Sequence, residues 1–138
     1  MQEELQNDKI RLLAIFKDSI MLDYLGKLMS TDEYSCSLVS NTENIIALLK
    51  QVKPAILLVD DFTAQQLGIE ICKIVKSVDE LNSIPLILYT DQKSELTTKH
   101  LCDVFIEKPA NANEFIEQID EVAIQYVIRD ENVAFDYI

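Results

Sequence analysis

The sequence predicts an α/β domain of the doubly wound type, in which a parallel sheet lies between two layers of helices. Short aliphatic runs alternate along the chain with segments whose apolar residues recur at helical spacing. Each run passes to the next helical segment through a few residues, which favours parallel strands joined by helical crossovers. The chain has 138 residues, 49% of them hydrophobic, and is long enough to bury the core of one such domain.

Five segments are predicted to form strands. The central one is the unbroken apolar run Ile56–Val59, which ends on the adjacent carboxylates Asp60 and Asp61. A short run of this kind is typical of a strand buried on both faces. The other strands are predicted at Ile10–Phe16, at Ser35–Ser40 (short and exposed), at Ile84–Asp91 and at Val104–Pro109.

Helices are predicted between and after these strands. Asp18 or Ser19 is expected to cap the first helix, and Asn41 or Thr42 the second, because short polar side chains accept hydrogen bonds from a first turn. The segment Ser94–Leu101 shows poor helical periodicity and is the weakest element. The apolar faces of the remaining helices are predicted over Met21–Met29, Ile45–Val52, Ile69–Val78 and about Asn113–Ile128.

The charge balance excludes several classes of partner. Twelve Lys and Arg residues against 24 Asp and Glu residues give a formal net charge of −12, which repels nucleic acid and anionic membranes. The acidic start of the chain does not look like a signal peptide, so we expect a cytoplasmic protein. We predict a flexible N-terminus over 1–9, the domain over 10–128 and a tail over 129–138, whose apolar end could support a homodimer, as could the last helix.

Cysteine and histidine give no sign of a zinc site. Cys36, Cys72 and Cys102 lie far apart and form no CxxC pair, and the chain has one histidine, His100. Each cysteine stands among apolar residues, so we expect the thiols to act as small buried hydrophobes. A lone histidine in a weakly helical segment is interpreted as a surface residue rather than a phosphotransfer group.

Polar residues follow four of the predicted strands. In a doubly wound sheet the carboxyl ends of the strands meet at one edge, where ligands bind, so Asp18, Asp60, Thr90 and Lys108 are expected to converge. A carboxylate at a strand end also commonly caps the following turn, and this remains the alternative for Asp60 and the expectation for Asp61.

With these residues in place, the chain resembles a receiver domain of the bacterial response regulators, of the single-domain chemotaxis type. The resemblance rests on Asp60, on Gly68 eight positions later, on Thr90 at the end of the next strand and on Lys108-Pro109 after the last one. It covers roughly Arg11 to Ile128, and the motifs are specific only in combination.

The resemblance implies a flavodoxin-like (βα)5 sandwich with strand order 2-1-3-4-5 and no enzymatic output of its own. It implies signalling through a sensor histidine kinase or phosphotransfer protein and a downstream protein partner. The implied site would comprise Asp60 as phosphoacceptor, Lys108 and Thr90 against the phosphoryl oxygens, Phe105 as a switch residue with Thr90, and magnesium held by Asp18, Asp60 and the backbone carbonyl of Phe62.

Several residues depart from the family pattern at this site. Lys17 stands where an acid is expected and would weaken magnesium binding, unless its long side chain points to solvent. Asp91 adds a negative charge beside Thr90, which would oppose phosphorylation. Leu67 and Ala110 also differ from the family pattern.

These departures leave two interpretations open: a phosphoryl-accepting receiver, and a pseudo-receiver that binds partners without phosphate. A phosphatase of the haloacid-dehalogenase type is disfavoured because Phe62 stands where its second aspartate would be. A nucleotide binder is disfavoured because the loop after the first strand has no glycine to cradle a phosphate.

Overall fold

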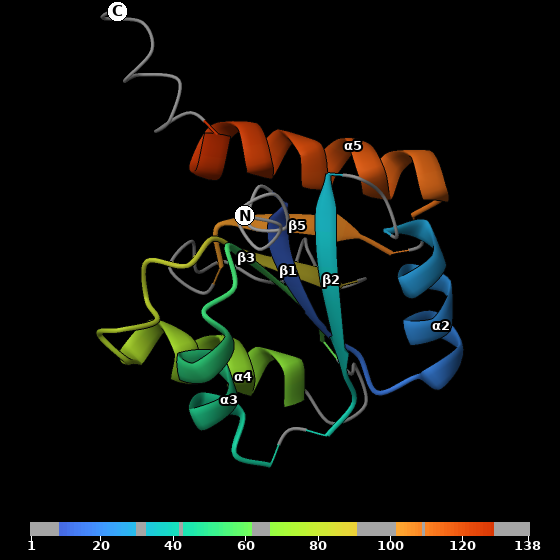
Figure 1. The fold of residues 1–138 in the computed structure, drawn as a ribbon. Coiled ribbons are helices and arrows are strands. Elements are labelled where there is room, and N and C mark those ends of the chain that lie inside the picture. The colour runs from blue at the N-terminus through green and yellow to red at the C-terminus, as the bar shows by residue number, and fades with distance from the viewer. Residues whose placement is uncertain are drawn as a thin grey trace, which may run out of the picture.

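The aliphatic runs of the sequence form a five-stranded parallel sheet in the order β2-β1-β3-β4-β5 (Figure 1). The computed structural model describes residues 9–29, 33–41, 43–61, 67–90, 102–108 and 110–128. The predicted fold class and strand order are confirmed. The strands are β1 (Ile10–Ile15), β2 (Tyr34–Val39), β3 (Ile56–Asp60), β4 (Leu86–Thr90) and β5 (Val104–Glu107).

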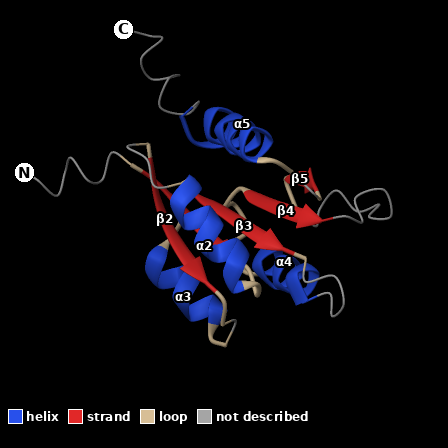
Figure 2. Cartoon of the chain, turned by 90° about the vertical axis from the view of Figure 1, so that its right-hand side faces the viewer, coloured by secondary structure: helices blue, strands red, loops and turns tan. Residues whose placement is uncertain are grey.

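Helices cover both faces of the sheet (Figures 1 and 2). One face packs against α2 (Ser19–Leu28) and α5 (Ala112–Val122), and the other against α3 (Ile45–Val52) and α4 (Leu67–Ser77). Because both faces are covered, β3 in the middle of the sheet is buried over its whole length, as the apolar run predicted. We call the two sides the α5 face and the α4 face.

Strand alternation divides the core into two clusters, one on each face. Ile15 and Val59 lie in the cluster of the α4 face, while Ala14 and Leu58 lie in that of the α5 face. The cluster on the α4 face also contains the buried cysteines Cys72 and Cys102, which confirms their predicted packing role. Cys36, on the edge strand β2, is half-buried.

Helix starts agree only partly with the predicted caps. Asp18 caps α2, with its Oδ1 accepting a hydrogen bond from the Ile20 amide at 2.9 Å. Asn41 instead accepts from the Glu43 amide in the turn before α3. The helix begins only after Asn44, because the left-handed backbone of Asn44 (φ 57°) interrupts helical geometry.

The periodicity predicted one helix over about Asn113–Ile128, but the structure has two types of helix there. The chain continues beyond α5 as the π-helix η2 (Ala123–Ile128). At the junction the Ala123 amide is shared between the carbonyls of Ile119 and Asp120, so the regular hydrogen-bond ladder loosens there. In the part of the chain that the structure describes, no helix is both long and apolar enough to cross a membrane.

Candidate functional site

Three neighbouring strands deliver polar residues to the same edge of the sheet. β3 ends on Asp60, β4 ends on Thr90, and Lys108 directly follows β5. Backbone pairing continues past the strand ends: the Asp61 amide donates to the Tyr89 carbonyl (N···O 3.1 Å), and the Lys108 amide donates to the Thr90 carbonyl (2.9 Å). The structure therefore brings Asp60, Thr90 and Lys108 together, while their chemical roles stay predictions.

Asp60 lies in an aromatic row on the α5 face. It pairs in register with Tyr89 of β4, and Phe16 continues β1 on its other side, next to the pair formed by Ile15 and Val59. The Phe16 and Tyr89 rings have centroids 6.0 Å apart, and Phe16 is buried. Asp60 keeps a relative exposure of 9%, and its Oδ1 lies 2.5 Å from the Lys108 ammonium. Its carboxylate is thus ion-paired at the border of an apolar surface.

Asp61 lies next to Asp60 in sequence but points to the opposite face, as alternation requires. It is fully buried. Its Oδ2 accepts a hydrogen bond from the Thr90 hydroxyl, and its Oδ1 lies 3.0 Å from the Lys108 ammonium. A buried carboxylate is stable only when paired and hydrogen-bonded, and these two donors satisfy that requirement.

Gly68 explains how a helix can come close enough to bury Asp61. A Cβ atom at position 68 would lie 1.9 Å from the Asp60 carbonyl oxygen and 2.6 Å from the Asp61 Cα. The Gly68 amide also donates to the Asp61 carbonyl at 3.2 Å. Because the first turn of α4 touches the backbone at the end of β3, only a residue without a side chain fits there. The glycine of the sequence motif therefore has a direct packing role.

Lys108 serves both carboxylates. Burial by itself lowers the pKa of its ammonium, but the hydrogen bonds and charges of Asp60 and Asp61 outweigh burial and raise that pKa above its ordinary value. The ammonium also lies 5.2 Å from the centroid of the Tyr89 ring, within cation–π range. Lys108 is thus held in its charged form at the meeting point of the two faces.

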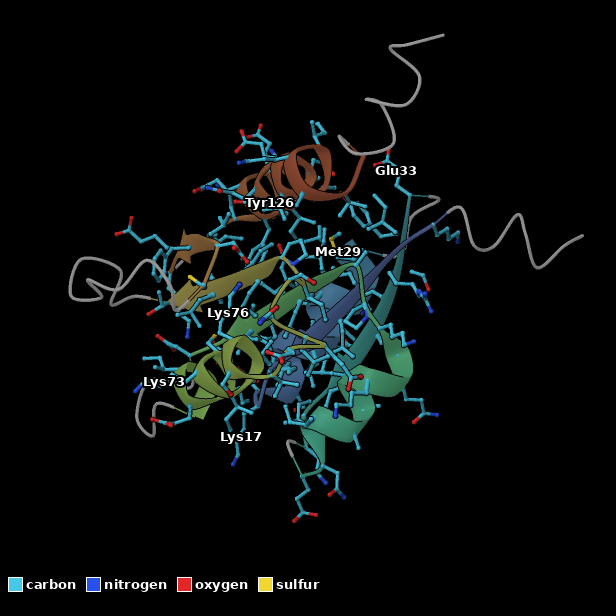
Figure 3. All side chains as sticks on the ribbon, turned by 90° about the vertical axis from the view of Figure 1, so that its left-hand side faces the viewer. Lys17, Met29, Glu33, Lys73, Lys76 and Tyr126 are labelled. Atoms are coloured by element: carbon cyan, nitrogen blue, oxygen red, sulfur yellow. The ribbon has the colours of Figure 1, made fainter. Side chains whose placement is uncertain are left out.

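The structure describes two of the three predicted magnesium ligands, Asp18 and Asp60. Asp18 is exposed and caps α2, and Phe62 lies outside the described residues. Lys17 is exposed, and Figure 3 shows its side chain pointing away from the body of the domain. Lys17 therefore follows the solvent-facing alternative and does not fill the site.

The donor set of the described residues does not fit magnesium well. Among them, no three His, Cys, Asp or Glu side chains come close enough to hold a metal ion. Asp60 and Asp61 both bind Lys108, and the residue that follows the β1 partner of Val59 is the buried Phe16, which offers no oxygen ligand from its side chain. Magnesium favours several oxygen ligands, including retained waters, and an ammonium competes for the same oxygens. Magnesium binding stays a prediction.

The other predicted site residues are either partly buried or outside the described residues. Phe105 of β5 is partly buried against the core on the α4 face, so an ordinary core role and a switch role are both open to it. Ala110 is partly buried, and its amide donates to the Tyr89 hydroxyl at 3.3 Å. Asp91 and Pro109 lie outside the described residues, as do His100 and the tail over 129–138.

Sequence reasoning missed two members of this cluster. Asp61 was expected only to cap the turn after β3, which lies outside the described residues, and its side chain also binds Thr90 and Lys108. Phe16 was assigned only to a strand, yet it is the residue beside Asp60. Strand alternation carried a usable signal for Asp61, since adjacent residues at the end of a buried strand face opposite layers.

Comparisons with known proteins agree with this fold. No family model matches the chain. Among curated proteins it is similar to the heme response regulator HssR of Staphylococcus saprophyticus, with 27% identity over 124 residues. That match covers 87% of this chain and 54% of the relative, so the chain spans about half the length of the curated protein it matches.

Two solved structures show the same architecture. The chemotaxis response regulator CheY4 of Vibrio cholerae has a TM-score of 0.72 and 14% identity, covering 83% of this chain and 98% of that one. A receiver-modulated diguanylate cyclase of Pelobacter carbinolicus has a TM-score of 0.68 and 20% identity, covering 92% and 98%. The chain therefore has the fold of response-regulator receiver domains, which confirms the resemblance drawn from its motifs.

Proposed function

We propose that this chain is a receiver-type signalling domain of a two-component pathway that acts by binding a protein partner and needs no phosphoryl group. One observation carries the proposal. The Lys108 ammonium and the Thr90 hydroxyl, the donors that a phosphoryl group on Asp60 would need, are both bonded to the Asp61 carboxylate. An arriving phosphoryl group would have to displace a buried carboxylate, which opposes phosphorylation.

The proposed role is binding in the cytoplasm, without catalytic turnover. A sensor histidine kinase or phosphotransfer protein, and a downstream protein, are the partners that a two-component pathway offers. The formal charge of −12 favours a partner with a basic surface, because complementary charge speeds encounter and suppresses wrong partners. The same charge disfavours nucleic acid as the direct target.

Beryllofluoride titration in the presence of magnesium tests the proposal on the wild-type chain, with Asp60→Asn as the control. Beryllofluoride imitates a phosphoryl group on a carboxylate, so amide NMR would report occupancy of Asp60. We expect no saturable shift at millimolar magnesium in either protein. Acetyl phosphate followed by intact mass measurement should likewise show no phosphorylated species.

A phosphoryl-accepting receiver is the second candidate. The observation in its favour is that Asp60 lies at the sheet edge with a side-chain exposure of 13%, whereas the side chain of Asp61 is fully buried. In that case shifts would appear around Asp60, Thr90 and Lys108 and would vanish in Asp60→Asn. Such a result would overturn the phosphate-free proposal and establish the phospho-switch.

A further inference from the structure

We propose that Asp61 is a built-in ligand: its carboxylate fills an oxyanion site formed by the Thr90 hydroxyl and the Lys108 ammonium. The site would accept a small external oxyanion of the carboxylate or phosphate class once the Asp61 side chain is shortened. This inference rests on the proposed function to the extent that both depend on these donors being occupied in the native chain.

The bonding of Asp61 is that of a bound oxyanion. Each of its two oxygens has a different donor, Oδ1 the Lys108 ammonium at 3.0 Å and Oδ2 the Thr90 hydroxyl. The donors come from the ends of two other strands, β4 and β5. The bond from the charged Lys108 donor is charge-assisted, and lysine ammonium groups bind free carboxylates and phosphates in the same way.

The surroundings enclose the carboxylate. Asp61 has no exposed surface, and Thr90 is also fully buried. The first turn of α4 lies against the Asp61 backbone at Gly68. Truncation to alanine would therefore leave a polar cavity about the size of a carboxylate, lined by the two donors. A cavity of this kind binds small polar molecules and does not stay empty like an apolar one.

Charge favours refilling of that cavity. Within the described part of the chain, Asp60 and Asp61 both pair with Lys108, so these three side chains carry two negative charges and one positive charge, a net charge of −1. Without the Asp61 carboxylate the cluster is neutral, and one bound formate restores the native balance. Phosphorylation of Asp60 would instead replace its single negative charge by about two on the phosphoryl oxygens while Asp61 kept its own, so the cluster would become more negative.

The test is chemical rescue of Asp61→Ala by formate. Thermal unfolding is followed as sodium formate is increased, with sodium trimethylacetate at equal ionic strength as a carboxylate too large for the cavity. For a single site in the folded state, formate at tenfold its Kd multiplies the folding equilibrium constant about elevenfold. We expect this rise for Asp61→Ala with formate and no comparable rise with trimethylacetate.

Asp60→Ala is the matched control, because it removes the neighbouring carboxylate from the same ammonium on the other face. We expect neither it nor the wild type to respond to formate beyond the trimethylacetate baseline. Equal responses of Asp61→Ala to the two salts, or an equal formate response in the wild type, would overturn the inference. Saturation by inorganic phosphate as well would support it and extend the site to tetrahedral anions.

Two provisions keep the test decisive. If Asp61→Ala does not fold in plain buffer, refolding yield becomes the readout: recovery with formate alone supports the inference, and equal recovery in both salts contradicts it. Failure of this inference and failure of the proposed function also give different results. A wild-type response to beryllofluoride would overturn the phosphate-free role, while formate rescue alone decides whether Asp61 occupies an oxyanion site.

Discussion

Asp60 and Asp61 are adjacent, chemically identical and paired with the same lysine, yet they stand in different surroundings. On the α5 face Asp60 lies in a row with Phe16 and Tyr89 and keeps contact with solvent. On the α4 face Asp61 is fully buried and accepts a hydrogen bond from the Thr90 hydroxyl. Because the residue type is the same, the differences in burial and hydrogen bonding come from the helix layer that packs against each carboxylate.

The largest effect is expected from adding a side-chain atom at Gly68, where the first turn of α4 touches the backbone at the end of β3. Gly68→Ala would place a Cβ 1.9 Å from the Asp60 carbonyl oxygen, and backbone atoms cannot yield cheaply. We expect a loss of about 3 kcal/mol in the free energy of unfolding, because overpacking forces backbone shifts. Urea denaturation measures it. A loss below about 1 kcal/mol would mean that α4 does not seal the α4 face as described.

The other glycine in the chain is a matched control on the α5 face. A Cβ at Gly26, within α2, would meet only the Leu38 side-chain Cδ1, at 3.0 Å. That flexible methyl can move, and alanine is favoured over glycine in a helix by roughly 1 kcal/mol. We therefore expect Gly26→Ala to be neutral or stabilising in the same denaturation experiment.

Thr90→Val tests the polar contact on the α4 face. The substitution keeps the shape of the side chain and removes the hydroxyl that donates to Asp61. A hydrogen bond to a buried charged group is worth more than a neutral one, so we expect a loss of about 2 kcal/mol in the free energy of unfolding. An unchanged denaturation midpoint would contradict the assigned role of this hydroxyl.

Alkaline pH should lower the free energy of unfolding, because two thiols are buried on the α4 face. Burial raises the pKa of Cys102 from 9.0 to about 12, and the pKa of Cys72 is raised as well. Above pH 9.0 the unfolded chain loses thiol protons that the folded chain keeps, so stability falls as pH rises. Between about pH 8 and about pH 10, we expect each such thiol to cost about 1.4 kcal/mol.

Cys102→Ala isolates this contribution. The variant should be less stable than the wild type at pH 8, yet its stability should fall less steeply between the two pH values. Chemical denaturation at both values, under reducing conditions, gives the difference in slope. Identical slopes for variant and wild type would show that Cys102 ionises in the folded protein as easily as in the unfolded one.

The smallest effect is expected on the α5 face, from Tyr89→Phe. Its hydroxyl accepts only a long hydrogen bond from the Ala110 amide, at 3.3 Å, and the ring contacts with Phe16 and Phe115 would remain. We expect a loss of about 0.5 kcal/mol. Tyr89→Phe and Thr90→Val remove the hydroxyls of two neighbouring residues that lie on opposite faces of the sheet, so the two variants are compared directly. A loss as large as that of Thr90→Val would contradict the contrast drawn between the two faces.

The fold was predictable because its signals are local and repeated. The run Ile56–Val59 has the length and the unbroken apolar character of a buried strand, and its neighbours repeat that pattern. The strand order followed from the resemblance carried by Gly68 and Lys108. The break at Ala123 was not predictable, because the segment Ala123–Ile128 contains no proline or glycine that would mark a change of helix type.

The site was predictable in location but not in detail. Convergence of Asp60, Thr90 and Lys108 follows from parallel strands ending at one edge. Which aspartate meets Thr90 depends on where β3 stops relative to β4, and spacing along the chain does not determine this to one residue. A shift of one residue moves a side chain to the other face, so small errors in a strand end exchange Asp60 for Asp61.

Lys108 also has a consequence for how this sequence can vary among relatives. Its ammonium is ion-paired with two carboxylates on opposite faces of the sheet. Loss of the lysine would leave two neighbouring anions without their shared cation, and loss of one anion would change the net charge of the cluster. The three positions are therefore expected to co-vary, so that relatives with an uncharged residue at position 61 carry a cluster in which Lys108 and Thr90 can receive an anion from outside.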